Sequence, residues 1–276
     1  MDAFSRRAFL ALAGAAPFAL RAAGKHIPIG LELYSVREEL KKDLPTTVNA
    51  VAKMGYECVE FYAPYYEWTT DYAKQVRKQL DDLRIRCYST HNDRKVFTTE
   101  GLPKAIELNK ILGTHYIVLA HPGTVADLDG WKRVADDLNA ANKTMHADGL
   151  HAGYHNHDLE WKPIGDQKPL QVIAANTDKS IMLQLDVGTC LETGNDPVAW
   201  IESHPGRIRS MHLKSWTAEK GYRVLFGEGD IPWKQIFNAA ETKGGVEYYL
   251  MEQEESDYPE LEAADRCLVA YRSMRG

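Results

Sequence analysis

Short apolar runs alternate regularly with longer segments of helical character along this chain. The runs are rich in apolar or β-branched residues and predict eight strands, at residues 29–34, 58–62, 86–91, 116–121, 151–157, 181–187, 208–214 and 247–253. Segments with helical spacing or capping signals follow them, at residues 45–54, 72–83, 103–112, 131–147, 170–175, 197–203, 233–240 and 261–274. Gly55, Gly113 and Gly149 stand where a left-handed residue commonly ends a helix. Because strands begin roughly every 30 residues, the length of a βα unit, the pattern predicts an α/β fold, a (β/α)8 TIM barrel.

The alternation is not divided by a linker. No Pro/Gly/Ser-rich stretch, block of like charge or low-complexity segment interrupts it, so we expect one catalytic domain over residues 24–276. A doubly wound open sheet is the structural alternative, but it normally carries a glycine-rich phosphate turn after its first strand. Residues 33–37 contain no glycine. The barrel is therefore favoured, and in a barrel the functional side chains gather at the C-terminal ends of the strands.

Charge and cysteine content limit the partners of the chain. Its 276 residues include 33 Lys and Arg against 39 Asp and Glu, giving a formal net charge of −6. A chain of this kind has no bulk positive field to hold a phosphate backbone, so nucleic acid is not expected as a partner. Cys58, Cys87, Cys190 and Cys267 are far apart and form no C-x-x-C pair. They fit isolated core positions better than a disulfide framework or a thiolate zinc site.

The N-terminus resembles an export signal. Arg6 and Arg7 precede an alanine-rich apolar run through Leu20, and small residues follow at 22–24. The paired arginines are similar to those of a twin-arginine signal peptide, and the run is short for a membrane span. We therefore expect residues 1–23 to be a twin-arginine export signal, a periplasmic or exported mature protein, and no stable membrane anchor after cleavage. The alternative is a short hydrophobic helix packed on the domain.

The predicted strand ends carry many acidic and imidazole side chains. In chain order these residues, with one lysine, are Glu32, Glu60, His91, His121, His155, His157, Glu160, Asp186, His212, Lys214, Glu252 and Glu254. Oxygen and nitrogen donors of this kind suit Mn²⁺, Co²⁺, Mg²⁺, Fe²⁺ or Zn²⁺. Several also have a purely structural explanation. Glu32, Glu60 and Glu254 fit helix caps or charge partners, and His91 and His121 fit hydrogen-bonded histidines at the edge of the core.

Asp186, His212 and Glu252 differ from the others because each ends an apolar run. An unpaired charge at such a position would be costly to bury. A shared divalent cation explains all three residues at once. We therefore expect them to be ligands of one metal ion.

Five segments of the chain resemble the sugar phosphate isomerase/epimerase group of xylose isomerase-like TIM barrels. They are residues 29–37 (IGLELYSVR), 154–161 (YHNHDLEW), 185–189 (LDVGT), 211–214 (MHLK) and 227–230 (GEGD). The resemblance implies a divalent metal held by one ligand from each of four strands, commonly Glu, Asp, His and Glu. The last three fall on Asp186, His212 and Glu252. The first falls on His155, with His157 as the alternate, because histidine stands here in place of the usual glutamate.

Two departures from the family pattern bear on the chemistry. Ketose 3-epimerases of this superfamily use two metal-bound glutamates on opposite faces of the sugar, and only Glu252 remains of that pair. Thr189 stands three residues after Asp186, where ketose epimerases and the related endonuclease IV enzymes have histidine. An endonuclease would lose a metal ligand there, and the acidic composition also argues against one.

The resemblance implies removal of a proton from a carbon next to a carbonyl, with the metal stabilising an enediolate. Glu252, His157 and Glu160 are the candidate bases, and Lys214 is placed to neutralise the oxyanion or to donate a proton. Return of the proton to carbon gives isomerisation or epimerisation. Loss of a β-oxygen substituent gives a lyase, as in related barrels that dehydrate inososes or cleave 3-keto-glycosides. The residues leave both outcomes open.

We expect the substrate to be a sugar or keto-sugar. Glu60 and His91 are candidate substrate contacts at the strand ends, and Tyr65 and Trp68 belong to an aromatic loop at residues 62–68. Aromatic faces pack well against the C–H faces of sugar rings. The same loop also fits packing by its own rings or contact with a second subunit, which would make a homo-oligomer. A non-catalytic periplasmic carbohydrate-binding protein with a vestigial metal site is the rival from another functional class.

Overall fold

The protein forms a closed barrel of eight parallel strands. A computed structural model describes residues 26–276, so the predicted export signal lies outside the described residues. The strands are β1 (Ile29–Glu32), β2 (Cys58–Phe61), β3 (Arg86–Asp93), β4 (Tyr116–His121), β5 (His151–His155), β6 (Met182–Asp186), β7 (Ser210–Leu213) and β8 (Tyr248–Met251). They pair in chain order, and β1 pairs with both β2 and β8. The predicted (β/α)8 barrel is confirmed.

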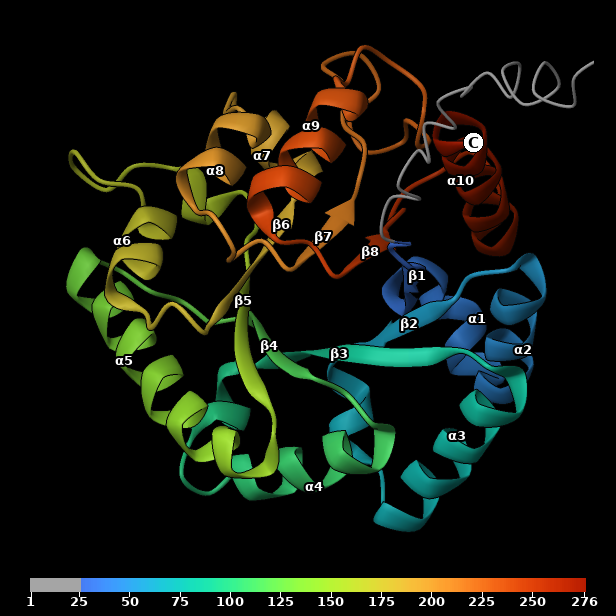
Figure 1. Cartoon of the computed structure of the whole chain (residues 1–276), viewed down its shortest axis with the longest axis horizontal. Helices are drawn as coiled ribbons and strands as arrows, with labels where there is room; N and C mark the ends of the chain where they lie inside the picture. Colours follow the sequence, from blue (N-terminus) through green and yellow to red (C-terminus); the bar gives the residue numbers. More distant parts are fainter. Residues whose placement is uncertain (1–25) are drawn as a thin grey trace, which may run out of the picture.

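Helices surround the strands (Figure 1). They are α1 (Arg37–Lys42), α2 (Leu44–Met54), α3 (Thr70–Leu83), α4 (Leu102–Leu112), α5 (Leu128–Met145), α6 (Pro169–Asn176), α7 (Val187–Glu192), α8 (Pro197–Ser203), α9 (Trp233–Ala239) and α10 (Glu260–Arg275). Short helical turns accompany them: η1 (Leu33–Val36), η2 (Ala63–Glu67), η3 (Arg94–Phe97), η4 (His146–Asp148), η5 (Leu159–Trp161) and the π-helical η6 (Ala240–Gly244). Within residues 26–276, no helix combines the length and apolarity needed to cross a bilayer.

All eight predicted helical segments are present, and the structure adds two. Helices α1 and α7 have six residues each and directly follow the first and sixth strand regions, so neither is long enough to show a helical period. The predicted left-handed positions are also confirmed. Gly55, Gly113 and Gly149 have φ values of 101°, 77° and 72°.

The interior of the barrel is divided into an apolar floor and a polar upper layer. The floor consists of Cys58, Tyr116, Val118, Met182, Tyr248 and Leu250. Because strand side chains alternate between faces, residues two positions further along point to the same side. Cys58 is thus followed inside by Glu60, and Leu250 by Glu252, both buried. The polar layer lies at the C-terminal ends of the strands, where the sequence predicts the site.

Hydrogen bonds between the two ends of the chain reinforce the closure of the barrel. Helix α10 lies beside α1 and α2 (Figure 1). Tyr56 Oη donates to the carbonyl of Ala264 at 2.8 Å, and Arg272 donates to the carbonyl of Gly55 at 2.8 Å. Glu260 accepts the backbone N–H of Glu38 at 3.0 Å. The first and last βα units are therefore held together by their helices as well as by the β1–β8 ladder.

Candidate metal centre

Four of the predicted site residues meet inside the C-terminal end of the barrel. One ligand atom from each of His155, Asp186, His212 and Glu252 lies within 4.8 Å of the others, and all four residues are buried. They come from the ends of β5, β6 and β7 and from the residue after β8. His157, the alternate to His155, is not part of this group. The four residues are called the metal centre below.

The surroundings of the Asp186 carboxylate indicate whether these four residues suit a bound cation. Its Oδ1 accepts the backbone N–H of Thr189 at 2.8 Å, whereas its buried Oδ2 has no hydrogen-bond donor. Two basic side chains lie within 4.0 Å of it, Lys214 with Nζ at 3.7 Å and His155 with Nε2 at 4.0 Å. Burial raises the pKa of Asp186 to about 6 even though Lys214 opposes the shift. A buried carboxylate oxygen without a partner is costly, so a cation beside it fits the donor set.

Gln184 orients two of the histidines. Its Oε1 accepts hydrogen bonds from His155 Nδ1 at 3.1 Å and from His91 Nε2 at 2.7 Å. Its amide nitrogen donates to Glu60 Oε1 at 3.1 Å and to Ser210 Oγ at 3.2 Å. An amide oxygen only accepts, so His155 carries its proton on Nδ1 and turns the Nε2 lone pair towards Asp186.

Gln184 is not among the site residues predicted from the sequence. It is a buried polar residue two positions before Asp186 in an otherwise apolar run, and therefore on the same face of β6. That spacing was the available signal. Burial, followed by the neighbouring His212 and His91, lowers the pKa of His155 well below its usual value. Its ring is therefore neutral, the form that binds metals.

His212 lies between two carboxylates. Its Nδ1 is 2.5 Å from Glu252 Oε2, and its Nε2 is 2.8 Å from Glu60 Oε2. Burial alone would lower the pKa of His212, but the two carboxylates outweigh it and raise that pKa well above the usual value. Burial alone would likewise raise the pKa of Glu252, yet Lys214 and His212 hold it well below normal. Glu252 is therefore ionised, and a metal ion on His212 would replace a proton there.

Lys214 is a buried cation next to the metal centre. Its Nζ is 3.6 Å from Glu252 Oε1 and forms an ion pair with Glu254. It also lies 4.6 Å from the centroid of the Tyr222 ring. Burial opposes the charged form, but Glu252 and Asp186 raise the pKa of Lys214 well above its usual value. Lys214 is therefore an ammonium group suited to stabilising negative charge, and it does not act as a base.

Carboxyl groups outnumber cationic side chains around the metal centre. Four buried carboxyl groups lie here, those of Glu32, Glu60, Asp186 and Glu252, beside the cationic His212 and Lys214. Burial, followed by the charge of Glu60, raises the pKa of Glu32 well above normal. Glu32 accepts the backbone N–H of Leu33 at 3.0 Å, as the cap interpretation predicts. This concentration of carboxylates is a second reason why a divalent cation fits the site.

Glu60 and His91, predicted to contact substrate, lie directly beside the metal centre. Glu60 Oε2 is 3.1 Å from His91 Nε2, and the His91 ring stacks on His212 with centroids 4.9 Å apart. Burial would raise the pKa of Glu60, but His91 and His212 lower it below the usual value. Both side chains are buried at 0% and 6% exposure. Their positions near the ends of β2 and β3 therefore place them beside the candidate ligands.

The structure does not bring Tyr65 and Trp68 to the metal centre. Tyr65 is buried, and its hydroxyl donates to Asn92 Oδ1 at 2.6 Å and accepts from Asn109 Nδ2 at 2.9 Å. Trp68 packs edge-on against Phe61, with ring centroids 5.1 Å apart. Trp68 also packs edge-on against Tyr65 in η2 and Tyr72 in α3, with centroids 6.1 and 5.3 Å apart, so the loop after β2 is held largely by aromatic packing.

His157 and Glu160 lie at one side of the metal centre. The His157 ring is edge-on to His155, with centroids 4.9 Å apart, and stacks on the exposed ring of His121 at 5.3 Å. Glu160 accepts the Tyr154 hydroxyl at 2.6 Å and the backbone N–H of His157 at 2.9 Å. Burial, followed by His121, lowers the pKa of His157 to about 3. Glu160 therefore supports the backbone of a half-buried, neutral His157.

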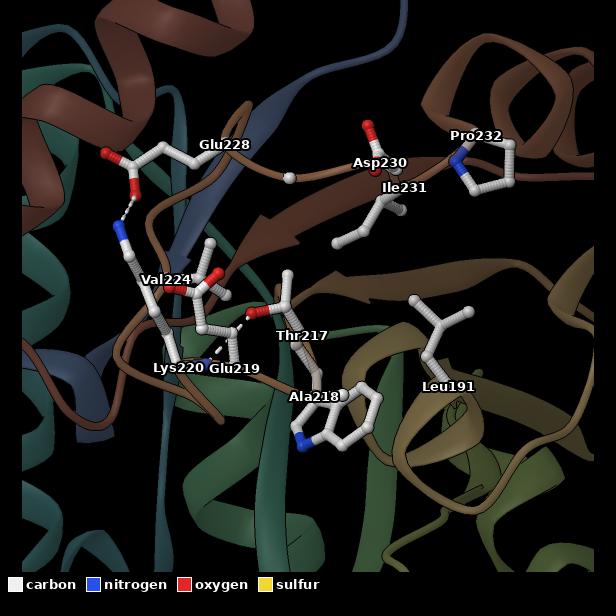
Figure 2. Close-up of a pocket in the computed structure, with 12 residues that line it drawn as sticks. Leu191, Thr217, Ala218, Glu219, Lys220, Val224, Glu228, Asp230, Ile231 and Pro232 are labelled. Carbon is white, nitrogen blue, oxygen red and sulfur yellow. Dashed lines mark hydrogen bonds and ion pairs between the residues drawn. The ribbon is translucent and has the colours of Figure 1, made fainter.

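A long loop after β7 forms a hollow of about 540 Å³ (Figure 2). Leu191 from the end of α7 faces loop residues there, and Lys220 lies 3.7 Å from Glu228 across one wall. Lys220 also donates its backbone N–H to Thr217 Oγ1 at 3.2 Å. None of the predicted ligands lines this hollow. It is therefore a feature of the loop rather than of the metal centre.

Comparisons with known proteins agree with the geometry. An inosose dehydratase of Clostridium beijerinckii is 24% identical over 143 residues, which cover 45% of this chain and 47% of that protein. The chain thus spans about half the length of the curated relatives it matches. A solved sugar phosphate isomerase/epimerase from Parabacteroides distasonis has a TM-score of 0.75 and 26% identity, covering 91% of this chain and 95% of its own.

A more distant structural neighbour was solved with a metal. The IOLI protein, determined with a bound zinc atom, has a TM-score of 0.66 and 16% identity, covering 90% of this chain and 97% of its own, a likeness of fold alone. Residues 48–269 match one family, described as Xylose isomerase-like TIM barrel. Since this match covers most of the chain, and the strands close into the corresponding barrel, the protein belongs to the xylose isomerase-like TIM barrel family.

Proposed function

We propose that this protein is a divalent-metal-dependent enzyme that removes a proton next to the carbonyl of a sugar or keto-sugar, with an isomerase or epimerase outcome. The convergence of His155, Asp186, His212 and Glu252, with an unpartnered Asp186 Oδ2, carries the proposal. The relatives named as a sugar phosphate isomerase/epimerase and an inosose dehydratase support it.

The metal centre would supply two imidazole nitrogens and two carboxylate oxygens. Such a mixed set suits Zn²⁺, Mn²⁺, Co²⁺ or Fe²⁺ and is less typical of Mg²⁺, which prefers oxygen ligands. When bound, the ion provides Lewis-acid stabilisation of negative charge that develops on substrate oxygens.

Three side chains in or beside the metal centre are candidates for the proton-transfer and charge-stabilising roles. Glu252 is an ionised carboxylate and the first candidate for the base that takes the proton. Lys214 is an ammonium group 3.6 Å from Glu252 and is suited to stabilising an oxyanion. His157 is a neutral imidazole that lies on the His155 side of the centre and is suited to accept or return a proton.

A lyase is the second candidate function. The candidate proton-transfer groups are one carboxylate, Glu252 in the metal centre, and one imidazole, His157 beside His155, instead of two matched glutamates. Such an asymmetric pair is better suited to taking a proton at one position and assisting a leaving group at another than to symmetrical epimerisation. The inosose dehydratase relatives point the same way.

Hydrogen–deuterium exchange tests the proposed function. The purified protein, loaded in turn with Zn²⁺, Mn²⁺ and Co²⁺, is incubated with a panel of ketoses and keto-glycosides in deuterated water, and the C–H signal next to the carbonyl is followed by NMR. We expect exchange or turnover that Glu252→Gln abolishes. The matched control is Glu255→Gln, an exposed glutamate three residues further along. If neither exchange nor turnover is detected with any member of the panel, the result would support the alternative of a non-catalytic carbohydrate-binding protein.

We also propose that the protein is exported by the twin-arginine route. The proposal rests on the paired Arg6 and Arg7 before an alanine-rich apolar run. Fractionation of cells that express the full chain is expected to place it outside the cytoplasm. Replacement of both arginines by lysine is expected to retain it inside, and equal distribution of the two forms would contradict this route.

A further inference from the structure

A second hollow opens beside the metal centre, between the loops that follow β4 and β5. Its volume is about 660 Å³, within the range of small-molecule sites. It differs from the hollow of the β7 loop in Figure 2, whose lining includes Glu219, Lys220, Glu228 and Asp230. The hollow between the β4 and β5 loops is called the side pocket below.

His157 connects the side pocket to the metal centre. Its ring lines the pocket together with His121, on which it stacks with an interplanar angle of 21°. The same ring is edge-on to His155, a predicted metal ligand, with centroids 4.9 Å apart. The His157 ring therefore lies between the side pocket and the candidate ligand His155.

The walls of the side pocket are mostly apolar. They include Pro122, Val125, Trp131, Leu159, Pro163 and Ile164. Leu159 is 63% exposed, the largest exposed fraction among the large apolar side chains of the described residues. Exposed apolar side chains at the edge of a concave site indicate ligand binding.

The polar residues of the side pocket do not favour a charged ligand or a second sugar. Asp158 and Lys162 pair with each other at 2.5 Å, so they leave no net charge for a phosphate. Proline has no backbone N–H, and two prolines in the loops, Pro122 and Pro163, reduce the donors that sugar hydroxyls need.

We propose that the side pocket binds the apolar aglycone of a glycoside whose sugar ring occupies the metal centre. This inference rests on the proposed function, because it places the sugar at the metal. It assigns the substrate to keto-glycosides, whose ring keeps a carbonyl beside a C–H, that carry an aryl or similarly flat apolar group, rather than to free sugars or sugar phosphates; simple glycosides serve below as unreactive probes of the aglycone contact. Leu159, which is 63% exposed, supplies most of the apolar contact, together with the other apolar lining residues, because Trp131 is only 4% exposed.

Calorimetric titration of the Zn²⁺-loaded protein tests the inference. The probes are matched methyl and phenyl pairs of β-D-glucoside and β-D-galactoside, with glucose 6-phosphate as the charged comparison. We expect the phenyl member of a pair to bind at least tenfold more tightly than the methyl member. Leu159→Asp, and separately Thr124→Trp, which fills the pocket from an exposed position, are expected to remove most of that preference.

The matched control is Val269→Asp, which changes an apolar side chain that is 59% exposed on α10. It should leave the preference for phenyl glycosides intact. Equal binding of both members of each pair, no binding of either, or loss of the preference in Val269→Asp would overturn the inference. Exchange in deuterated water is measured on the same preparation. If exchange depends on Glu252 but phenyl glycosides bind no better than methyl glycosides, the side-pocket inference is wrong and the proposed function stands. If phenyl glycosides bind better but no exchange occurs, the proposed enzymatic function is wrong and the side-pocket inference stands.

Discussion

Individual hydrogen bonds, and not charges alone, determine the orientation of the histidine side chains at the metal centre. Gln184 accepts from both His155 and His91, so it fixes the tautomer of a predicted ligand. Gln184→Leu keeps a similar volume but removes these acceptors and is expected to weaken Zn²⁺ binding by about 10–100-fold. Chelator competition measures that affinity. The matched control, Gln75→Leu at an exposed position of α3, should bind as tightly as the wild type. Unchanged affinity in Gln184→Leu would show that His155 needs no orienting partner.

At the same scale, Glu160 predicts a pH dependence of stability. Burial raises the pKa of Glu160 in the folded protein above its ordinary value. The contribution of this group to stability is therefore fully present below the unfolded pKa and is lost as the pH rises through the folded pKa. The glutamine side chain of the Glu160→Gln variant cannot ionise. The free energy of unfolding of the variant minus that of the wild type should therefore increase as the pH rises from about 4 to about 7. Urea unfolding at several pH values checks this, and parallel pH profiles for the two proteins would contradict it.

At the scale of elements, Arg207 joins three neighbouring segments near the start of β7. Its guanidinium donates to the carbonyl of Ala174 at 2.7 Å, to Thr177 Oγ1 at 2.8 Å and to the carbonyl of Ile181 at 3.2 Å. Burial lowers the pKa of Arg207 to about 10, so it stays charged at neutral pH. Arg207→Met leaves these acceptors unpaired and is expected to cost about 3 kcal/mol of unfolding free energy.

Urea unfolding measures this cost, and Arg209→Met is the matched control. Arg209 is only half-buried and donates to the Tyr116 hydroxyl at 3.2 Å, so its replacement should cost about 1 kcal/mol or less. Equal effects of the two substitutions would mean that the α6, β6 and β7 segments do not depend on the buried guanidinium.

At the scale of the whole molecule, the barrel concentrates buried carboxylates at one end, so a bound cation should stabilise the fold. A ligand that binds only the folded state at about 100 times its Kd adds about 2.7 kcal/mol, or about 5–10 °C in Tm for a domain of this size. We expect such a shift with Zn²⁺, Mn²⁺ or Co²⁺ and its reversal by EDTA. Asp186→Asn retains the Oδ1 acceptor for Thr189 and should fold but show no shift. Identical melting with and without every metal would count against the metal centre.

Much of this molecule follows from local sequence patterns. The eight strands, eight of the ten helices and the left-handed glycines are all readable from apolar spacing and capping, because these depend on neighbours along the chain. The polar layer is also readable, since alternation places Glu60 above Cys58 and Glu252 above Leu250. The residues for a metal site were thus predictable, including Asp186 and His212.

The contacts between side chains of different strands are decided by the tertiary structure and not by those local patterns. Strands distant in the chain become neighbours only when β1 pairs with β8. The register of β5 on β6, which pairs His155 with Gln184, sets which of His155 and His157 lies near Asp186. Gln184 gains its role from contacts across β2, β3, β5 and β7. Tyr65 turns inward because its hydroxyl donates to Asn92 and accepts from Asn109. Side-chain direction at a strand end depends on packing with several other strands, and no pattern of nearest neighbours in the sequence contains that information.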